Sequence, residues 1–152
     1  MGDEKIIAQL LTKLDDLSGE EILQLEESGL PKLAEPYVQR IVDLLAAKKY
    51  AEIPQQAELT NNWTVEDLQE FAEGFLADSD LPYFDKFGVP CDFNPQYEYY
   101  QLNCFLYDDG TGFHVDYDLT TDGELNDLTL QLDFWFQPDN TLKVCFYDVH
   151  VM

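Results

Sequence analysis

The residues best suited to chemistry are two histidines, each close to an aspartate on a predicted strand. His114 and Asp116 are two residues apart in an alternating apolar and polar segment, so they project from one face of that strand. Such a pair can act as a general base or supply part of a metal site. A metal site needs three or four ligands, however, and an exposed polar pair explains the pattern more simply. His150 and Asp148 have the same spacing, and a hydrogen bond at a sheet edge accounts for them.

Other catalytic and ligand-binding motifs are missing. No G-x-S-x-G segment and no adjacent cysteine and histidine mark a nucleophile, and no glycine-rich run precedes a lysine and a helix as in a phosphate loop. Asp116, Asp118 and Asp122 do not follow the spacing of a calcium loop. The three cysteines lack C-x-x-C spacing, which argues against a disulfide framework or structural zinc. We expect no catalytic residue, metal or cofactor, and predict that the chain is not an enzyme.

Aromatic and acidic side chains are interleaved on one side of the predicted sheet, opposite Leu130 and Val144. Tyr99 and Phe105 belong to this set. Tyrosine and tryptophan bury a large area at low entropy cost, and carboxylates bind arginine and lysine, so such a surface suits a basic partner. The alternative is that the aromatic residues form core beneath the N-terminal helices. The predicted partner-binding residues are Tyr107, Asp108, Asp109, Asp116, Asp118, Asp133, Trp135 and Tyr147.

The net charge selects between classes of partner. The 152 residues carry a formal charge of −23, from 31 acidic and 8 basic residues. Residues 1–50 contain ten acids and six bases (−4), and residues 51–152 contain 21 acids and two bases (−19). The resulting field repels nucleic acid phosphates and anionic membranes and attracts basic proteins. Alternatively, the acids only solvate the exposed face of a sheet.

The N-terminal third is predicted to be helical. Apolar residues recur at helical spacing over residues 6–17, and Ser18 and Glu21 form a capping box for a short helix that Gly29 and Pro31 end. Pro36 suits the first position of a third helix, which ends near Lys49. Residues 50–62 are expected to be an irregular connection, and Thr64 caps a helix over residues 64–77.

From residue 97 onward the apolar period changes to two, which indicates strands. Three turn signals separate four strands: Asp108-Asp109-Gly110, Thr121-Asp122-Gly123 and Pro138-Asp139-Asn140. Near the end, Val149 and Val151 are out of phase with Val144 and Phe146, so we expect a bulge near Asp148. The predicted fold is α+β, with N-terminal helices packed on a four-stranded antiparallel meander.

The chain is expected to be one domain (1–152), with a helical part (1–50) followed by a helix and the sheet (63–152). The 45% hydrophobic content suffices for a core. We find no signal-peptide pattern and no apolar run long enough for a membrane span, so we expect a cytoplasmic protein.

On these features the chain resembles bacterial immunity proteins, the cytosolic antidotes of contact-dependent growth inhibition and related toxin systems. The resemblance rests on size, acidity, helices followed by a curved antiparallel sheet, and a face rich in Tyr, Trp and Asp. It covers the whole chain and involves no residue-specific motif. It implies tight binding to a basic toxin domain, such as a nuclease, whose phosphate-binding cleft the antidote blocks. The order of elements also resembles cone-shaped NTF2-like or cystatin-like folds.

Two other functions fit the sequence. A concave NTF2-like sheet can enclose a pocket for a small molecule or a reaction, using polar groups such as His114, Asp116 and Tyr117. A structural or adaptor subunit can pair through its nearly neutral N-terminal helices. The sequence leaves open whether the chain is a monomer or a homodimer.

Overall fold

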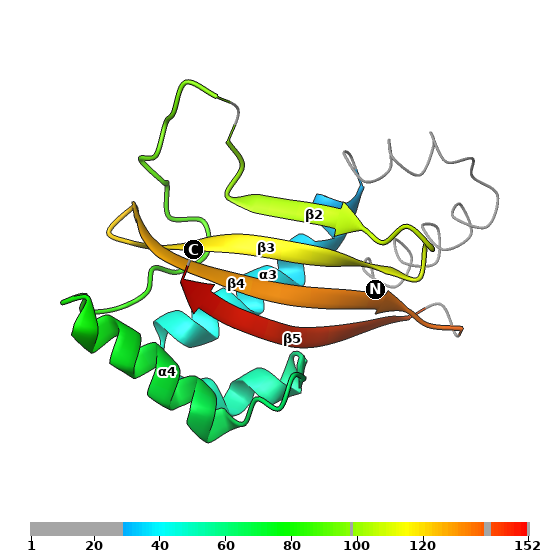
Figure 1. The fold of residues 1–152 in the computed structure, drawn as a ribbon, viewed down its shortest axis with the longest axis horizontal. Helices are drawn as coiled ribbons and strands as arrows, with labels where there is room; N and C mark the ends of the chain where they lie inside the picture. The colour runs from blue at the N-terminus through cyan, green and yellow to red at the C-terminus, as the bar shows by residue number, and fades with distance from the viewer. Residues whose placement is uncertain (1–28, 98, 139–140, 152) are drawn as a thin grey trace.

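The computed structural model describes residues 29–97, 99–138 and 141–151. The helices predicted over residues 6–17 and 18–28 lie outside these ranges. The fold is α+β, and in the described residues two α-helices pack on the same side of a five-stranded mixed sheet (Figure 1). The strand order is β1-β5-β4-β3-β2. The predicted four-stranded antiparallel sheet is therefore not exact, because a short fifth strand joins it in parallel.

Helix α3 (Leu30–Ala46) begins earlier than the predicted start at Pro36. Gly29 is its N-cap residue and Pro31 lies in its first turn, where no helical hydrogen bond needs the missing N–H. Pro36 lies inside the helix, where it removes one backbone hydrogen bond. Burial of an apolar stripe offsets this cost. The buried residues are Leu30, Leu33, Ala34, Val38, Ile41, Val42 and Leu45.

The segment after α3 is more ordered than the sequence predicts. It forms a 3-10 helix, η1 (Tyr50–Gln55), and a two-residue strand, β1 (Glu58–Leu59). Glu58 pairs with Cys145 and Leu59 with Phe146, and both pairs are parallel. Two paired residues are too few to produce a periodic pattern, so the prediction of an irregular connection was wrong here.

Helix α4 (Val65–Asp78) begins where the sequence predicts. The Thr64 hydroxyl accepts a hydrogen bond from the Asp67 backbone N–H at 3.1 Å, which satisfies a free donor of the first turn. Leu68, Ala72 and Leu76 are buried. Thus both the predicted cap and the predicted helix are confirmed.

The four longer strands are β2 (Leu102–Leu106), β3 (Gly112–Thr121), β4 (Glu124–Phe136) and β5 (Leu142–Val151), paired antiparallel in chain order. A two-residue turn joins β3 to β4. Both its residues, Asp122 (φ 55°) and Gly123 (φ 80°), have positive φ, as a tight hairpin requires. The predicted turn at 138–140 lies partly outside the described residues.

Two irregularities set the register of the sheet. In β5, Gln131 pairs with Asp148 but Leu132 pairs with Phe146, which leaves Tyr147 as an extra residue. This confirms the bulge predicted near Asp148. The pairing of β3 with β4 also changes register, at the point between Asp118 and Thr120. The pairing next to the turn, such as Thr121 with Glu124, therefore does not continue along the rest of the two strands.

One face of the sheet and the helices enclose the core. Phe113 stacks on Phe134 with ring centroids 4.7 Å apart, and Tyr37 of α3 packs edge-on against Phe134 at 5.6 Å. Val115 and Leu132 are 0% exposed. In Figure 1 the helices lie behind and below the sheet, and the opposite sheet face is turned to the viewer. No helix in the described ranges is long and apolar enough to cross a bilayer.

The segment from Ser79 to Tyr97 is irregular, and it is held in place by the buried carboxylate of Asp85. The alternating period predicts strand from residue 97 onward, but β2 begins only at Leu102. The Asp85 carboxylate accepts hydrogen bonds from the Thr120 hydroxyl (2.8 Å) and from the backbone N–H groups of Asp122 (2.9 Å) and Gly123 (2.8 Å). The Asp92 N–H also donates to the carbonyl of Gly123 at 2.8 Å. The segment is therefore attached to the β3–β4 turn.

Candidate functional site

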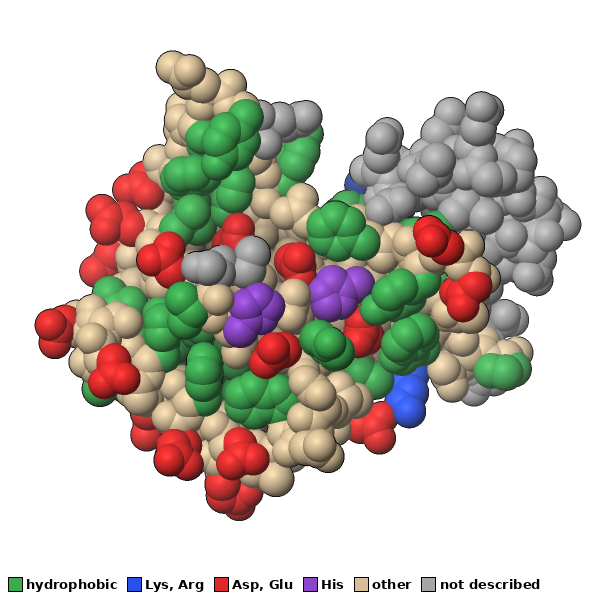
Figure 2. Space-filling view, viewed as in Figure 1, with side chains coloured by type: hydrophobic (Ala, Val, Ile, Leu, Met, Phe, Trp, Pro, Cys, Tyr) green, Lys and Arg blue, Asp and Glu red, His purple; other side chains and the backbone are tan. Residues whose placement is uncertain are grey.

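The face of the sheet turned away from α3, here called the open face, carries the polar and aromatic residues of β2–β5. In Figure 2 both histidines lie near its middle, between carboxylates and hydrophobic side chains. The strand register places the open-face residues in cross-strand rows, except for Tyr107, which directly follows β2, and Tyr147, the bulged residue of β5. The open-face residues are Asn103, Phe105, Tyr107, His114, Asp116, Asp118, Thr129, Gln131, Asp133, Trp135, Lys143, Cys145, Tyr147, Asp148 and His150.

At the centre of the open face, His114 is held between two carboxylates. Its Nδ1 lies 2.9 Å from Asp133 Oδ1, on the neighbouring strand β4, and its Nε2 lies 2.9 Å from Asp116 Oδ1, on its own strand. The three side chains are only 10 to 26% exposed. Since both ring nitrogens face carboxylate oxygens, both are best satisfied as N–H donors.

This geometry keeps His114 charged. Burial by itself lowers the pKa of His114, but the hydrogen bonds and charges of Asp116 and Asp133 outweigh burial and raise it to about 9. For Asp116, burial raises the pKa, and the hydrogen bonds from His114 and Gln131 outweigh that effect, so the net shift is downward. An imidazolium therefore sits between carboxylates at neutral pH. It has no lone pair with which to accept a proton or bind a metal ion.

The aromatic part of the site begins beside Asp133. The Tyr107 hydroxyl donates to Asp133 Oδ1 at 2.5 Å, the same oxygen that faces His114. Burial and this hydrogen bond raise the pKa of Tyr107 above its ordinary value. The Tyr107 ring stacks on Trp135, with centroids 5.1 Å apart and planes 12° apart. Gly112 makes the stack possible, since a Cβ atom there would lie 2.9 Å from Trp135 Cε3.

A third carboxylate, Asp118, connects the open face to the irregular segment before β2. Its Oδ1 accepts from the Thr129 hydroxyl at 2.9 Å and its Oδ2 from the Tyr99 hydroxyl at 2.7 Å. The sequence predicted Tyr99 within the first strand. In the structure it precedes β2 instead. The Gln101 side chain donates to the Tyr117 hydroxyl at 3.0 Å and to the Asp118 carbonyl at 2.8 Å. Tyr99 and Gln101, which both precede β2, are therefore hydrogen-bonded to β3.

Strand β5 completes the surface. Its bulged residue, Tyr147, is 41% exposed, and its ring lies edge-on to His114 at 5.7 Å. His150 Nδ1 is 3.4 Å from Asp148 Oδ2, without hydrogen-bond geometry. Cys145 is 3% exposed, and burial raises the pKa of its thiol, so the thiol stays protonated and unreactive at neutral pH.

The predicted partner-binding residues separate into two groups. Asp116, Asp118 and Asp133 lie on the open face with the predicted aromatic residues Tyr107, Trp135 and Tyr147. Asp108 and Asp109 lie in the β2–β3 turn and not among the open-face residues. Both are exposed, and Asp109 accepts hydrogen bonds from the backbone N–H and the hydroxyl of Thr111.

The sequence did not reveal the link between His114 and Asp133. The tight turn at Asp122 and Gly123 pairs Thr121 with Glu124, and continuing that register would place Gln131 opposite His114. The shift between Asp118 and Thr120 moves β4 by two residues, so Asp133 takes this position. A two-residue shift keeps every side chain on its face and leaves the alternating pattern unchanged.

The chemistry open to the described part of the chain depends on how its titratable side chains are grouped. No group of three or more His, Cys, Asp or Glu side chains within it is arranged to hold a metal ion. Both ring nitrogens of His114 are already hydrogen-bonded to the carboxylates of Asp116 and Asp133. The arrangement is suited to presenting charge and aromatic surface to a partner.

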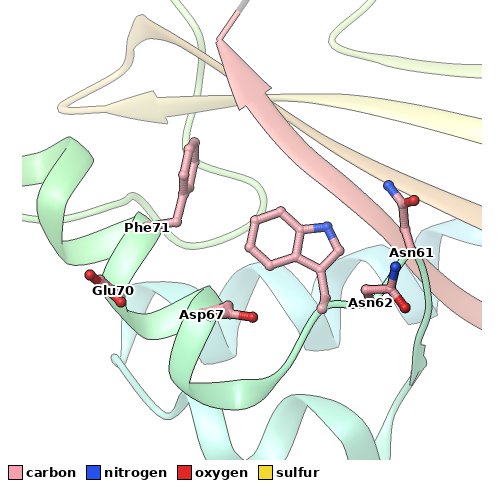
Figure 3. Close-up of a pocket in the computed structure, with 6 residues that line it drawn as sticks. Asn61, Asn62, Asp67, Glu70 and Phe71 are labelled. Atoms are coloured by element: carbon pink, nitrogen blue, oxygen red, sulfur yellow. The ribbon is translucent and has the colours of Figure 1, made fainter.

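A hollow of about 490 Å³ lies elsewhere, at the start of α4 (Figure 3). Trp63, one of its lining residues, packs edge-on against Phe146, whose side chain faces the core. The hollow is therefore on the helix side of the sheet, separate from the open face. Its lining residues are Asn61, Asn62, Trp63, Asp67, Glu70 and Phe71.

Comparison with known proteins finds a family but no characterised relative. Neither the curated proteins nor the solved structures give a significant match. Residues 42–152 match one protein family, and this range includes η1, α4 and all five strands. The chain therefore belongs to the family described as Domain of unknown function (DUF7668).

Proposed function

We propose that this chain is a protein-binding module whose open face binds a basic protein. The observation that carries the proposal is the His114 imidazolium held by Asp116 and Asp133 on a sheet face that aromatic side chains surround. More specifically, we propose that the chain is a cytoplasmic immunity protein that neutralises a basic toxin of the nuclease class.

Charge supports a cationic partner. The open face carries one imidazolium, that of His114, and four carboxylates, those of Asp116, Asp118, Asp133 and Asp148. The charge of Lys143 is balanced by Glu58, 2.9 Å away. Residues 87–142 contain no lysine or arginine. A surface with this potential speeds the approach of a basic protein and repels polyanions.

The hydrogen bonds leave part of this charge available to a partner. The bonds to Asp116 and Asp133 all go to Oδ1, and the described residues give no hydrogen bond to either Oδ2. The Asp116 oxygen, on a side chain that is 26% exposed, can accept from a guanidinium or ammonium group, and the Asp133 carboxylate, 10% exposed, adds its charge close by. In a nuclease toxin they would occupy the positions of substrate phosphates and so block the cleft.

Where a basic toxin domain is encoded immediately upstream of this chain, that domain is the partner for the test. Calorimetry should give a stable complex, and co-expression should remove toxicity. Asp116→Asn with Asp133→Asn should weaken binding by about tenfold or more. The matched control, Glu66→Gln with Glu70→Gln on α4, also removes two carboxylates and should have a smaller effect. Absence of a complex, or equal weakening by both pairs, would refute the proposal.

A small-molecule site in the sheet concavity has less support. The apolar face of the sheet is filled by α3, η1 and α4, and residues such as Val38, Ile53 and Leu68 are 0% exposed there. The hollow in Figure 3 lies outside that concavity. No observation in the described residues favours this second function over the first.

A further inference from the structure

Several large hydrophobic side chains remain exposed on the open face and in the irregular segment before β2. Phe105 and Tyr147 belong to the open face, at 49% and 41% exposure. Phe93 and Tyr97, at 38% and 66%, belong to the irregular segment before β2. The Phe93 ring lies 4.7 Å from Tyr99 and 6.4 Å from Tyr97, so the three rings form one cluster, here called the aromatic cluster.

The aromatic cluster is attached to the open face through Tyr99, and its segment is attached to the β3–β4 turn at two further points. Tyr99 donates to Asp118, Asp92 bonds to Gly123, and Asp85 fixes the start of the segment to the β3–β4 turn. A surface held in one conformation loses little entropy on binding. Exposed aromatic residues that are already ordered are the usual high-energy contacts of protein interfaces.

We propose that the aromatic cluster (Phe93, Tyr97 and Tyr99) extends the docking surface and binds apolar side chains that the basic partner presents beside its arginines and lysines. This inference rests on the proposed function. The carboxylates of the open face speed association, and the aromatic cluster slows dissociation. A second copy of this chain is not the occupant, because the charge of −23 makes two copies repel each other.

The test compares two 16-residue peptides of equal charge, one alternating arginine and serine and the other alternating arginine and leucine. Fluorescence anisotropy gives their Kd for the full chain at low and at high salt. Both should bind at low salt, and the leucine peptide should bind about tenfold more tightly at high salt, where the charges are screened. Phe93→Ser with Tyr97→Ser should remove that difference, and Tyr97→Phe should keep it.

The outcomes separate the two proposals. If the serine peptide does not bind at low salt, the proposed function fails and this inference fails with it. If the serine peptide binds but leucine gives no gain, or if the double substitution weakens both peptides equally, only the aromatic cluster is refuted. Sedimentation of the free chain as a dimer that Phe93→Ser with Tyr97→Ser dissociates would also overturn it.

Discussion

His114 and Asp133 lie directly opposite each other on β3 and β4, with Nδ1 and Oδ1 2.9 Å apart. The pair joins two strands on the open face, and Asp116 completes a bridge on the other side of the ring. Because the cluster is mostly shielded from water, its protonation state contributes to the stability of the fold as well as to the charge of the surface.

The charge on His114 makes stability depend on pH. The pKa is about 9 in the folded chain and 6.5 ordinarily, so the folded state binds the proton more tightly. The resulting stabilisation is complete below pH 6.5 and is lost as pH rises from 6.5 to 9, by on the order of 2 kcal/mol. Urea unfolding of wild type and His114→Gln across this range should show that loss in the wild type only. His150→Gln is the control, and a slope shared by wild type and His114→Gln would contradict the assignment.

Gly112 should not tolerate a side chain. A Cβ atom there would lie 2.1 Å from the Phe134 carbonyl oxygen and 2.9 Å from Trp135 Cε3. Gly112→Ala should therefore destabilise the chain by about 3 kcal/mol and change the near-UV circular dichroism of the Tyr107–Trp135 stack. Gly74→Ala is the matched control, because no atom lies within 4 Å of its added Cβ. It should stabilise α4 by about 1 kcal/mol. Similar stabilities for the two variants would be evidence against this packing.

Asp85 should hold the irregular segment on the β3–β4 turn. An asparagine side chain at this position would offer one acceptor oxygen and an NH₂ group where three donors converge. We expect Asp85→Asn to lower the free energy of unfolding by about 2 kcal/mol and to speed hydrogen exchange at the Gly123 N–H. Asp92→Asn changes an exposed aspartate of the same segment and serves as the control. The assignment fails if Gly123 exchanges equally slowly in both variants.

Local pattern predicted much of this fold. The alternation of Phe113, Val115 and Tyr117 with His114 and Asp116 gave the strand and its two faces, and the Thr64 cap gave the start of α4. Proline rules gave the wrong start for α3, because buried contacts of Leu30 and Leu33 outweigh the bond lost at Pro36.

Features set by distant contacts could not be predicted. β1 exists only because β5 lies beside it, and the segment before β2 takes its place from the buried Asp85 carboxylate. The open-face acids and aromatic residues were correctly assigned to one side. The partner of His114, in contrast, depends on a two-residue register shift that leaves no trace in the hydrophobic pattern.

The central claim, that the open face binds cationic protein, is tested most directly by amide chemical-shift mapping. The ¹⁵N-labelled chain is titrated with the arginine and serine peptide at low salt. We predict the largest shifts at His114, Asp116, Gln131, Asp133 and Tyr147. Shifts concentrated on α4, at Glu66, Glu70 and Glu73, would contradict the claim.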